Sequence, residues 1–185
     1  MTDSTHQLPE TDAFGRLRPV PAASRPDLLA APVAAALGPV PDALVVEIDA
    51  SLADTAAFCE AYGVPLEKSV NAVVVKGARA GVERFVVCMT PATKRVDVNK
   101  VVRKKLDVRS ASFAPMDEAI ALTGMEYGGI TPVGVPADWP VWIDADAVAL
   151  DWVCIGGGVR GSKLFLPGRA LADLPGAEVV EGLAR

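Results

Sequence analysis

Two glycine-rich segments have the composition of loops that bind a ligand through the main chain. The first is GGITP at residues 128–132, and the second is GGGVRG at residues 156–161. Paired glycines expose backbone N–H groups and let a ligand approach the main chain closely. A strand-like run and not a helix follows the second segment, which also lacks the GK[ST] ending of a P-loop, so the pattern argues against a dinucleotide-binding or nucleoside-triphosphate fold. Either segment could also be an ordinary turn.

Charged residues near these segments and at strand ends are the next candidates. Arg160, in the second segment, could meet a phosphate. Lys68 precedes an apolar strand, where a lysine either faces solvent or neutralises a phosphate or a developing oxyanion. Asp144 ends the run VWID, and it either accepts a hydrogen bond from a ligand or caps the turn that follows.

The histidine and cysteine content excludes several catalytic schemes. His6 is the single histidine and lies in a polar N-terminal stretch, which removes Ser-His-Asp and Cys-His nucleophiles and His-rich zinc sites. Cys59, Cys88 and Cys154 form no CxxC pair and lie among apolar residues, as buried reduced thiols do. We therefore expect no metal and no cofactor, and chemistry by lysine, carboxylates, hydroxyls and backbone amides.

Charge is distributed unevenly along the chain of 185 residues, whose net charge is -5. A negative total argues against a dedicated nucleic-acid binder. The segment 94–109, KRVDVNKVVRKKLDVR, nevertheless carries seven basic and two acidic residues, hence +5, which leaves -10 for the remainder. The sequence therefore predicts one basic surface on an acidic body.

The apolar pattern predicts an α+β fold with one domain. Residues 1–25 are polar and contain proline, so we expect a flexible leader followed by a domain at 26–185. Strands are predicted within 43–49, 69–77, 84–91 and 140–144, and a hairpin of two strands within 151–167. Helices are predicted within 26–37, 51–63 and 97–106, a strand-like start followed by a helix within 110–124, and a helix followed by a strand within 168–182. Gly63 and Gly124 are expected to end two of these helices, and Asp97 is expected to cap the helix at 97–106, whose apolar face is Val98, Val101, Val102 and Leu106. This order lacks the steady alternation of a parallel doubly wound sheet. We expect a mixed, barrel-like sheet flanked by helices.

The N-terminus is acidic and has no apolar core of a secretory signal. The apolar stretch at 28–46 contains Pro32, Pro39 and Pro41, which argues against a membrane span. The sequence thus predicts a cytoplasmic protein.

In their order and spacing, these segments resemble the YbaK/EbsC family of aminoacyl-tRNA editing domains, which includes Cys-tRNA(Pro) deacylases. The matching pieces lie between about residues 44 and 182 and are AYGVPLEKSVNAVVV, DVNKVVRKKL, LTGMEYGGITPVG, VWIDADAV and CIGGGVRGSKLFL. The resemblance implies a barrel-like α+β domain that hydrolyses the ester joining a wrong amino acid to the terminal ribose of a tRNA. Water and the substrate's own ribose hydroxyl, rather than a protein nucleophile, would do the chemistry. The implied partners are a mischarged tRNA and an aminoacyl-tRNA synthetase, with neither DNA nor a membrane.

The resemblance also implies roles for particular residues. Lys68 matches a lysine that contacts the substrate, and Gly128, Gly129 and Ile130 match a loop whose amides face the carbonyl group. Thr131 stands where serine is common and keeps the hydroxyl, so it completes the implied catalytic set. The implied substrate-binding positions are Pro132, Asp144, Gly157, Gly158 and Arg160. The basic residues expected to meet acceptor-stem phosphates are Lys94, Arg95, Lys100, Arg103 and Lys104.

Two features depart from the family pattern. Lys163 stands where some relatives carry an acidic residue, which changes the charge of the pocket. Roughly the first 40 residues have no counterpart. An alternative function is therefore a family member that lost catalysis and binds a tRNA, a nucleotide or a metabolite. A cysteine hydrolase using Cys88 or Cys154 would lack an activating histidine. Neither the edited amino acid nor the oligomeric state follows from the sequence.

Overall fold

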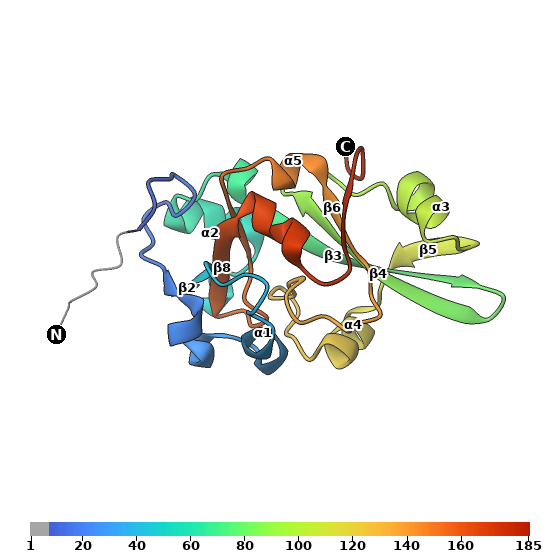
Figure 1. The fold of residues 1–185 in the computed structure, drawn as a ribbon, viewed down its shortest axis with the longest axis horizontal. Helices are drawn as coiled ribbons and strands as arrows, with labels where there is room; N and C mark the ends of the chain where they lie inside the picture. The colour runs from blue at the N-terminus through green and yellow to red at the C-terminus, as the bar shows by residue number, and fades with distance from the viewer. Residues whose placement is uncertain (1–7) are drawn as a thin grey trace.

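Two β-sheets, with short helices packed around them, make up the computed structural model, which describes residues 8–185 (Figure 1). His6 lies outside these residues. The first sheet has the order β1-β2-β8-β7 and is antiparallel throughout. Its strands are β1 (Val20–Pro21), β2 (Leu44–Glu47), β7 (Trp152–Gly156) and β8 (Ser162–Pro167).

The second sheet has the order β5-β3-β4-β6-β9 and is mixed, because β6 runs parallel to both β4 and β9. Its strands are β3 (Val70–Arg79), β4 (Val82–Pro91), β5 (Ser110–Phe113), β6 (Val141–Asp144) and β9 (Ala177–Val180). A parallel bridge between Ser69 and Cys154 links the start of β3 to β7. The predicted α+β class with a mixed sheet is confirmed, although the two sheets do not close into a barrel.

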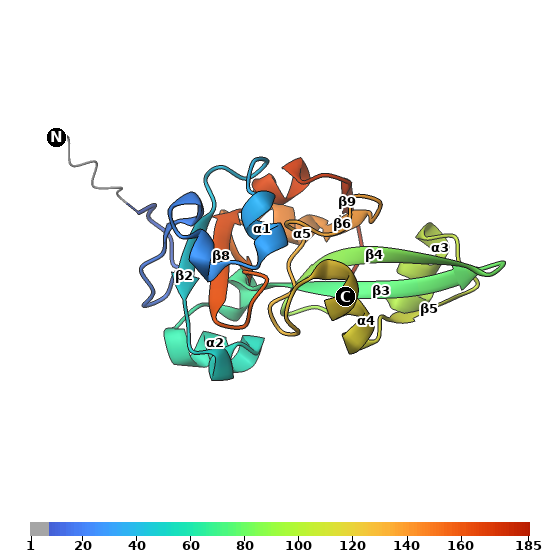
Figure 2. The same cartoon turned by 90° about the horizontal axis from the view of Figure 1, so that it is seen from below.

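Strands β3 and β4 form a long hairpin that projects from the body of the molecule (Figure 2). Ten residue pairs join them, from Val70 opposite Pro91 to Arg79 opposite Val82. The turn is Ala80-Gly81, and both residues have positive φ, 51° and 78°. Two-residue hairpin turns take this conformation because it matches the twist of the strands.

The helices are short. The α-helices are α1 (Ala31–Ala35), α2 (Thr55–Tyr62), α3 (Arg103–Lys105), α4 (Met116–Thr123) and α5 (Ala145–Val148). The 3-10 turns are η1 (Ala22–Ser24), η2 (Pro26–Leu28), η3 (Ala50–Leu52), η4 (Leu66–Lys68) and η6 (Gly168–Asp173), and η5 (Val98–Val102) is a π-turn. Helices α2 and α4 each end at a left-handed glycine, Gly63 and Gly124, as the sequence predicted.

The predicted helix at 97–106 forms as η5 followed by α3. The Asp97 carboxylate accepts a hydrogen bond from the Lys100 N–H and caps its start. Val102 and Leu106 are buried in a cluster with Cys88 and Trp142, so the predicted apolar face is confirmed. This packing turns the basic side chains of the segment outward.

Residues 8–25 differ from the flexible leader that the sequence predicted. Phe14 is only 4% exposed, and its ring packs edge-on against Trp152 and Phe165. The Arg16 N–H donates a hydrogen bond to the Tyr62 carbonyl at 2.8 Å. The few apolar residues of this polar segment are buried against the first sheet, a contact that local composition does not reveal.

Candidate active site

A cavity of about 340 Å³ lies between the two sheets, where β3 begins and α2 starts. Both glycine-rich segments border it, together with β7 and β8. Its lining residues are Ala53, Asp54, Thr55, Phe58, Ser69, Val70, Asn71, Ala72, Val73, Tyr127, Gly128, Ile130, Cys154, Ile155, Gly156 and Lys163. The wall thus combines apolar side chains with six polar or charged ones, those of Asp54, Thr55, Ser69, Asn71, Tyr127 and Lys163.

The two glycine-rich segments pack main chain against main chain. The Gly158 N–H donates to the Gly129 carbonyl at 2.7 Å. A Cβ atom at Gly129 would lie 2.5 Å from the Val159 carbonyl carbon, and one at Gly156 would lie 2.3 Å from the Gly129 oxygen. No side chain fits at these distances, so the glycines allow the segments to meet.

The three backbone amides that were predicted to face the substrate carbonyl differ in whether they already donate a hydrogen bond within the protein. The Gly129 N–H is occupied, because it donates to the Glu126 carbonyl at 2.9 Å. The N–H groups of Gly128 and Ile130 donate no hydrogen bond to a protein group within residues 8–185. Both of these residues line the cavity, so two of the three donors remain available to a ligand.

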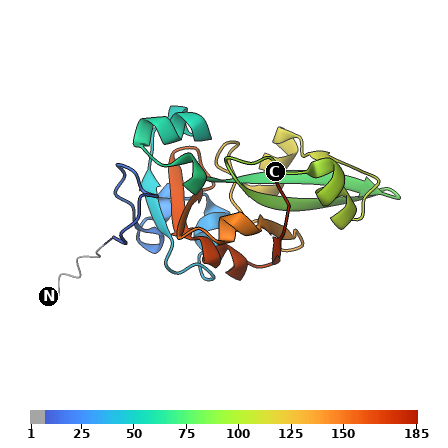
Figure 3. The same cartoon turned by 90° about the horizontal axis from the view of Figure 1, so that it is seen from above.

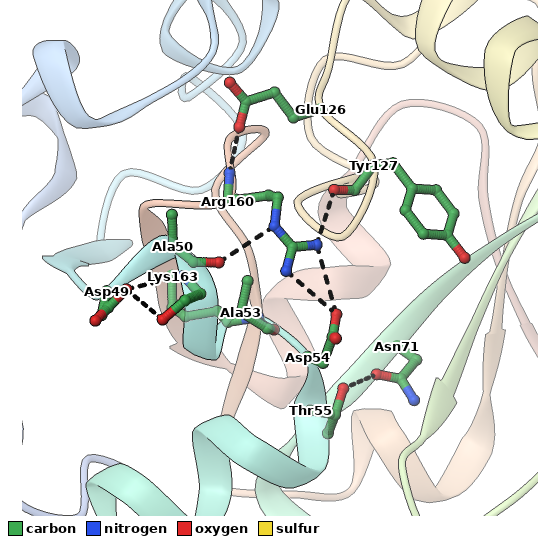
Figure 4. A network of polar contacts seen from close by, with 11 residues as sticks. Asp49, Ala50, Ala53, Asp54, Thr55, Asn71, Glu126, Tyr127, Arg160 and Lys163 are labelled. Atoms are coloured by element: carbon green, nitrogen blue, oxygen red, sulfur yellow. Dashed lines mark hydrogen bonds and ion pairs between the residues drawn. The ribbon is translucent and has the colours of Figure 1, made fainter.

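Arg160 holds the rim of the cavity together (Figure 4). Its N–H donates to the Glu126 carboxylate at 2.7 Å. Its guanidinium donates to the carbonyls of Ala50 and Tyr127 at 3.2 and 3.4 Å, and lies 3.5 Å from the Asp54 carboxylate. These contacts join η3, α2 and the first glycine-rich segment, so the guanidinium predicted to meet a phosphate is engaged with the protein.

Lys68 does not line the cavity. Its ammonium group makes an ion pair with Asp151 and lies 3.4 Å from the Asp12 carboxylate. The hydrogen bond from Lys68 is the main cause that lowers the pKa of Asp151 to about 2, and the same contact raises the pKa of Lys68. The structure therefore places Lys68 in a structural ion pair, away from the groups it was predicted to join.

Asp144 also lies outside the cavity lining and is 1% exposed. One carboxylate oxygen accepts from the Asp146 N–H at 3.2 Å, which caps α5, and the other accepts from the Ala184 N–H at 3.0 Å. Lys94 donates to Asp144 at 3.1 Å and to Asp146 at 2.6 Å, and these hydrogen bonds raise its pKa. Asp144 thus caps the turn, and Lys94 is neutralised beside it.

Thr131, which was predicted to be catalytic, and the remaining predicted substrate-binding residues do not line the cavity. Thr131 and Pro132 are buried outside the lining, and the Thr131 hydroxyl has no hydrogen-bond partner among the described residues. The Gly157 carbonyl accepts from the Ala30 N–H at 3.2 Å, and Gly158 has φ +84°. These residues shape the two segments.

Four of the five predicted phosphate contacts stay exposed. Arg95, Lys100, Arg103 and Lys104 are exposed, and none makes an ion pair with any described residue. All three views place α3 at the opposite end of the molecule from α2, which borders the cavity (Figure 3). A ligand that reaches both regions must therefore span the length of the domain.

Four cavity residues have no predicted role from the sequence. The Thr55 hydroxyl donates to the Asn71 side-chain carbonyl at 2.9 Å. The signal for Asn71 was a polar residue inside the apolar strand VNAVVV. Phe58 faces the cavity from α2, and Lys163 reaches it from β8. Of the four, Lys163 was noted only as a departure from the family pattern.

Lys163 is the buried cation of this cavity. The residue is 7% exposed, and its ammonium donates to the Ala53 carbonyl at 2.8 Å (Figure 4). It also lies 5.0 Å from the centre of the Phe58 ring. Burial lowers the pKa of Lys163, because a low-dielectric surrounding disfavours the charged form.

Comparison with known proteins identifies the domain. The family model for the aminoacyl-tRNA editing domain matches residues 49–174, which include every residue that lines the cavity. The chain belongs to the aminoacyl-tRNA editing domain family. Membership indicates aminoacyl-tRNA editing, a hydrolytic activity on tRNA, as the class of function. The resemblance inferred from the sequence is confirmed.

Individual relatives of this editing domain agree with that assignment. A candidate Cys-tRNA(Pro)/Cys-tRNA(Cys) deacylase of Enterococcus faecalis, EbsC, is 21% identical over 122 residues, which cover 66% of this chain and 72% of EbsC. The crystal structure of a candidate trans-editing enzyme for prolyl-tRNA synthetase matches with a TM-score of 0.70 and 25% identity, over 82% of this chain and 94% of that one. A scaffold protein used for computational epitope grafting matches equally, with 95% of its chain covered.

Neither a membrane-spanning helix nor a cluster of metal ligands is present in residues 8–185. No helix in this range is long and apolar enough to cross a membrane. No group of three or more His, Cys, Asp or Glu side chains there is arranged to hold a metal ion.

Proposed function

We propose that this editing domain acts in trans on mischarged tRNA and hydrolyses the ester between the amino acid and the terminal ribose. The observation that carries the proposal is a cavity bordered by the N–H groups of Gly128 and Ile130, which donate no hydrogen bond to any residue in the described range 8–185. Donors placed where negative charge develops stabilise a tetrahedral intermediate. The products are a free amino acid and a tRNA with a free terminal hydroxyl.

The reaction needs no protein nucleophile. Water adds to the ester carbonyl carbon, and the carbonyl oxygen becomes an oxyanion that accepts hydrogen bonds from the two amides. The bond to the ribose oxygen then breaks, and that oxygen takes the proton released by the water. Buried thiols do not compete for this role, because burial raises the pKa of Cys88 and of Cys154 to about 12.

The exposed basic surface of α3 and the segment before it gives the tRNA a second contact. We assign contacts with acceptor-stem phosphates to four exposed residues, Arg95, Lys100, Arg103 and Lys104. Such contacts depend on charge and not on the base sequence of the tRNA. An aminoacyl-tRNA synthetase that releases mischarged tRNA is the natural source of substrate. We place the reaction in the cytoplasm, where these synthetases work.

A deacylation screen tests this proposal. Purified protein is incubated with a panel of tRNAs, each charged with a wrong amino acid, and loss of the ester is measured against a no-enzyme control. We expect turnover of at least one member. We expect Ile130→Pro, which removes one of the two donors, to lower that rate about 100- to 1000-fold. Binding of tRNA with no turnover across the panel would instead establish the alternative, a binding module without catalysis.

A further inference from the structure

We propose that Lys163 is a catalytic residue whose ammonium binds the carbonyl oxygen of the substrate ester and stabilises the oxyanion formed from it. This inference depends on the proposed deacylation, and it assigns to Lys163 the part that the sequence pattern had suggested for Lys68. It rests on the position of Lys163 in the cavity, on its hydrogen bond to Ala53 and on the absence of a counter-ion among the residues that the structure describes.

The ammonium of Lys163 is incompletely satisfied. A protonated lysine has three N–H donors, and one hydrogen bond is found for Lys163, to the Ala53 carbonyl. No carboxylate among residues 8–185 lies within 4.0 Å of its nitrogen. Burying a charge without a partner is costly, and folded proteins pair such groups. An oxygen atom entering the cavity would occupy the unused donors.

The position of this ammonium is fixed by the fold. Lys163 lies on β8 between β2 and β7, opposite Val46 on one side and Gly156 on the other. The Phe58 ring lies under the nitrogen, and the Ala53 carbonyl holds one of its donors. A cation held on a central strand is preorganised, so little free energy is spent on ordering it when the substrate binds.

The charged and titratable groups around Lys163 come from each element packed against it. Helix α2 contributes Cys59, Asp54 lies just before that helix, and β7 contributes Cys154. Arg160 approaches from the second glycine-rich segment. The Asp54 carboxylate is shared with the Arg160 guanidinium at 3.5 Å, so it does not neutralise Lys163. The positive charge therefore remains available to a ligand.

In this proposal the oxyanion meets three donors from residues that line the same cavity, the N–H groups of Gly128 and Ile130 and the ammonium of Lys163. As water adds to the carbonyl carbon, negative charge moves onto the oxygen that these donors contact. The carbon–oxygen bond to the ribose then breaks, and the released oxygen takes the proton lost by the attacking water. Lys163 keeps its own proton throughout, so it acts as a cation and not as a base.

The test compares Lys163→Met, Lys163→Arg and Lys68→Ala on the mischarged tRNA that the wild type hydrolyses best. We expect Lys163→Met to lower kcat/KM about 100- to 1000-fold. Methionine is compatible with the neighbouring apolar side chains of the cavity, Phe58 and Ile155. The melting temperature of the Lys163→Met variant should therefore equal or exceed that of the wild type. We expect Lys68→Ala to keep kcat/KM within about threefold of the wild type, as an ion pair outside the cavity predicts.

The pH dependence of kcat/KM distinguishes a Lys163 that acts as a cation in catalysis from one that has only a structural role. For the wild type, we expect kcat/KM, corrected for spontaneous hydrolysis, to fall as the pH rises through the lowered pKa of Lys163. Lys163→Arg stays protonated, so its residual activity should not fall over that range. A rate that rises with pH in the wild type and is lost in the arginine variant would overturn the assignment, because it would make Lys163 a base.

A binding measurement keeps this inference distinct from the proposed function. The probe is an adenosine whose 3′ position carries the amino acid through an amide, which the enzyme does not hydrolyse. We expect Lys163→Met to weaken binding of this probe at least tenfold and Lys68→Ala to leave it unchanged. If the wild type hydrolyses tRNA but Lys163→Met matches it in rate and in binding, the role of Lys163 is wrong and the function stands. If the wild type neither binds the probe nor hydrolyses any tRNA, the proposed function itself is wrong.

Discussion

Lys68 and Lys163 differ in what their ammonium groups contact, and this difference decides their roles. Each lies close to the beginning of a strand, so sequence pattern treats them alike. Asp151, the ion-pair partner of Lys68, follows 83 residues later in the chain. Lys163 instead meets a backbone carbonyl and an aromatic ring. Only the folded chain brings these partners together, which is why the sequence pattern did not indicate that Lys163, and not Lys68, lines the cavity.

Replacing Lys68 by alanine should affect stability at neutral pH by about 1 kcal/mol or less, because half-exposed ion pairs contribute little. The folded-state pKa of Asp151 is about 2, below its ordinary value of about 3.9. A lowered folded-state pKa stabilises the protein above the unfolded value, and this contribution disappears as the pH falls from about 4 to about 2. The difference in the free energy of unfolding between wild type and variant, measured in urea, should therefore decrease as the pH falls from about 4 to about 2.

Asp151→Asn provides the matched control for Lys68→Ala. It should show a loss of similar size, and the double variant should lose little more than either one. Additive losses in the double variant would show that the two side chains do not stabilise the fold through their mutual contact.

At the scale of elements, the two glycine-rich segments act as one unit. Their glycines, the Asp97 cap and the glycines that end α2 and α4 are local signals, and the sequence predicted each of them. The sequence did not show that Gly129 packs against Val159, or that its N–H is already used. Those facts depend on how two distant turns meet, which no local pattern contains.

Gly129→Ala should separate the two segments. Its Cβ would lie 2.5 and 2.6 Å from the carbonyl carbon and oxygen of Val159, which are backbone atoms that cannot rotate away. We expect a loss of about 1–3 kcal/mol in the free energy of unfolding, as for other overpacked sites, together with a lower deacylation rate. Urea unfolding and the deacylation assay measure the two effects.

Gly161→Ala is the control within the same segment. The nearest atom to its added Cβ is 4.0 Å away, and its φ is not in the left-handed region. It should unfold and react like the wild type. Equal losses in the two variants would show that glycine flexibility, and not the close approach at Gly129, is what the segment requires.

At the scale of the whole molecule, the domain is longer at its N-terminal side than the sequence indicated. Residues 8–25 cover part of the first sheet, and Ala13, Phe14 and Leu17 join a cluster with Phe58 and Phe165. The polar composition of this segment does not reveal the packing, because burial of three apolar residues against a hydrophobic surface is enough to hold the segment in place. The strand pairing of both sheets likewise needed tertiary contacts.

Phe14→Ala tests this packing. Removing a buried aromatic ring should lower the free energy of unfolding by about 3–5 kcal/mol. Val20→Ala, at an exposed position of the same segment, should cost much less. Urea unfolding followed by tryptophan fluorescence is a suitable measurement, since Trp152 contacts Phe14. If Phe14→Ala leaves the free energy of unfolding unchanged, the segment is not packed on the domain and the prediction of a flexible leader is correct.

The basic surface lies at the opposite end of the molecule from α2, so its contribution to tRNA binding can be tested separately from hydrolysis in the cavity. Replacing Lys100, Arg103 and Lys104 together by glutamine should weaken tRNA binding on the order of 10- to 100-fold and reduce the salt dependence by about two to three counterions. Hydrolysis of a 3′-aminoacyl-adenosine, which is too short to reach α3, should not change. Nitrocellulose filter binding at several salt concentrations measures the first effect.

Arg18, Arg25 and Arg169 form the control for the basic surface. They are exposed arginines outside the segment 94–109, and replacing them removes the same number of charges. Their loss should leave tRNA affinity within about threefold of the wild type if the contact is local. Equal weakening by both triple variants would mean that the tRNA responds to total charge and not to α3.

The projecting β3–β4 hairpin has a practical consequence. A Cβ built at Gly81, in its turn, meets no atom within 4 Å, and the tip extends beyond the rest of the molecule in every view. A peptide tag or a fluorescent label inserted at Ala80-Gly81 would therefore stay clear of the cavity. Anchored to a surface by this handle, single molecules would keep their cavities open to solution, so that the arrival and departure of labelled tRNA could be watched directly.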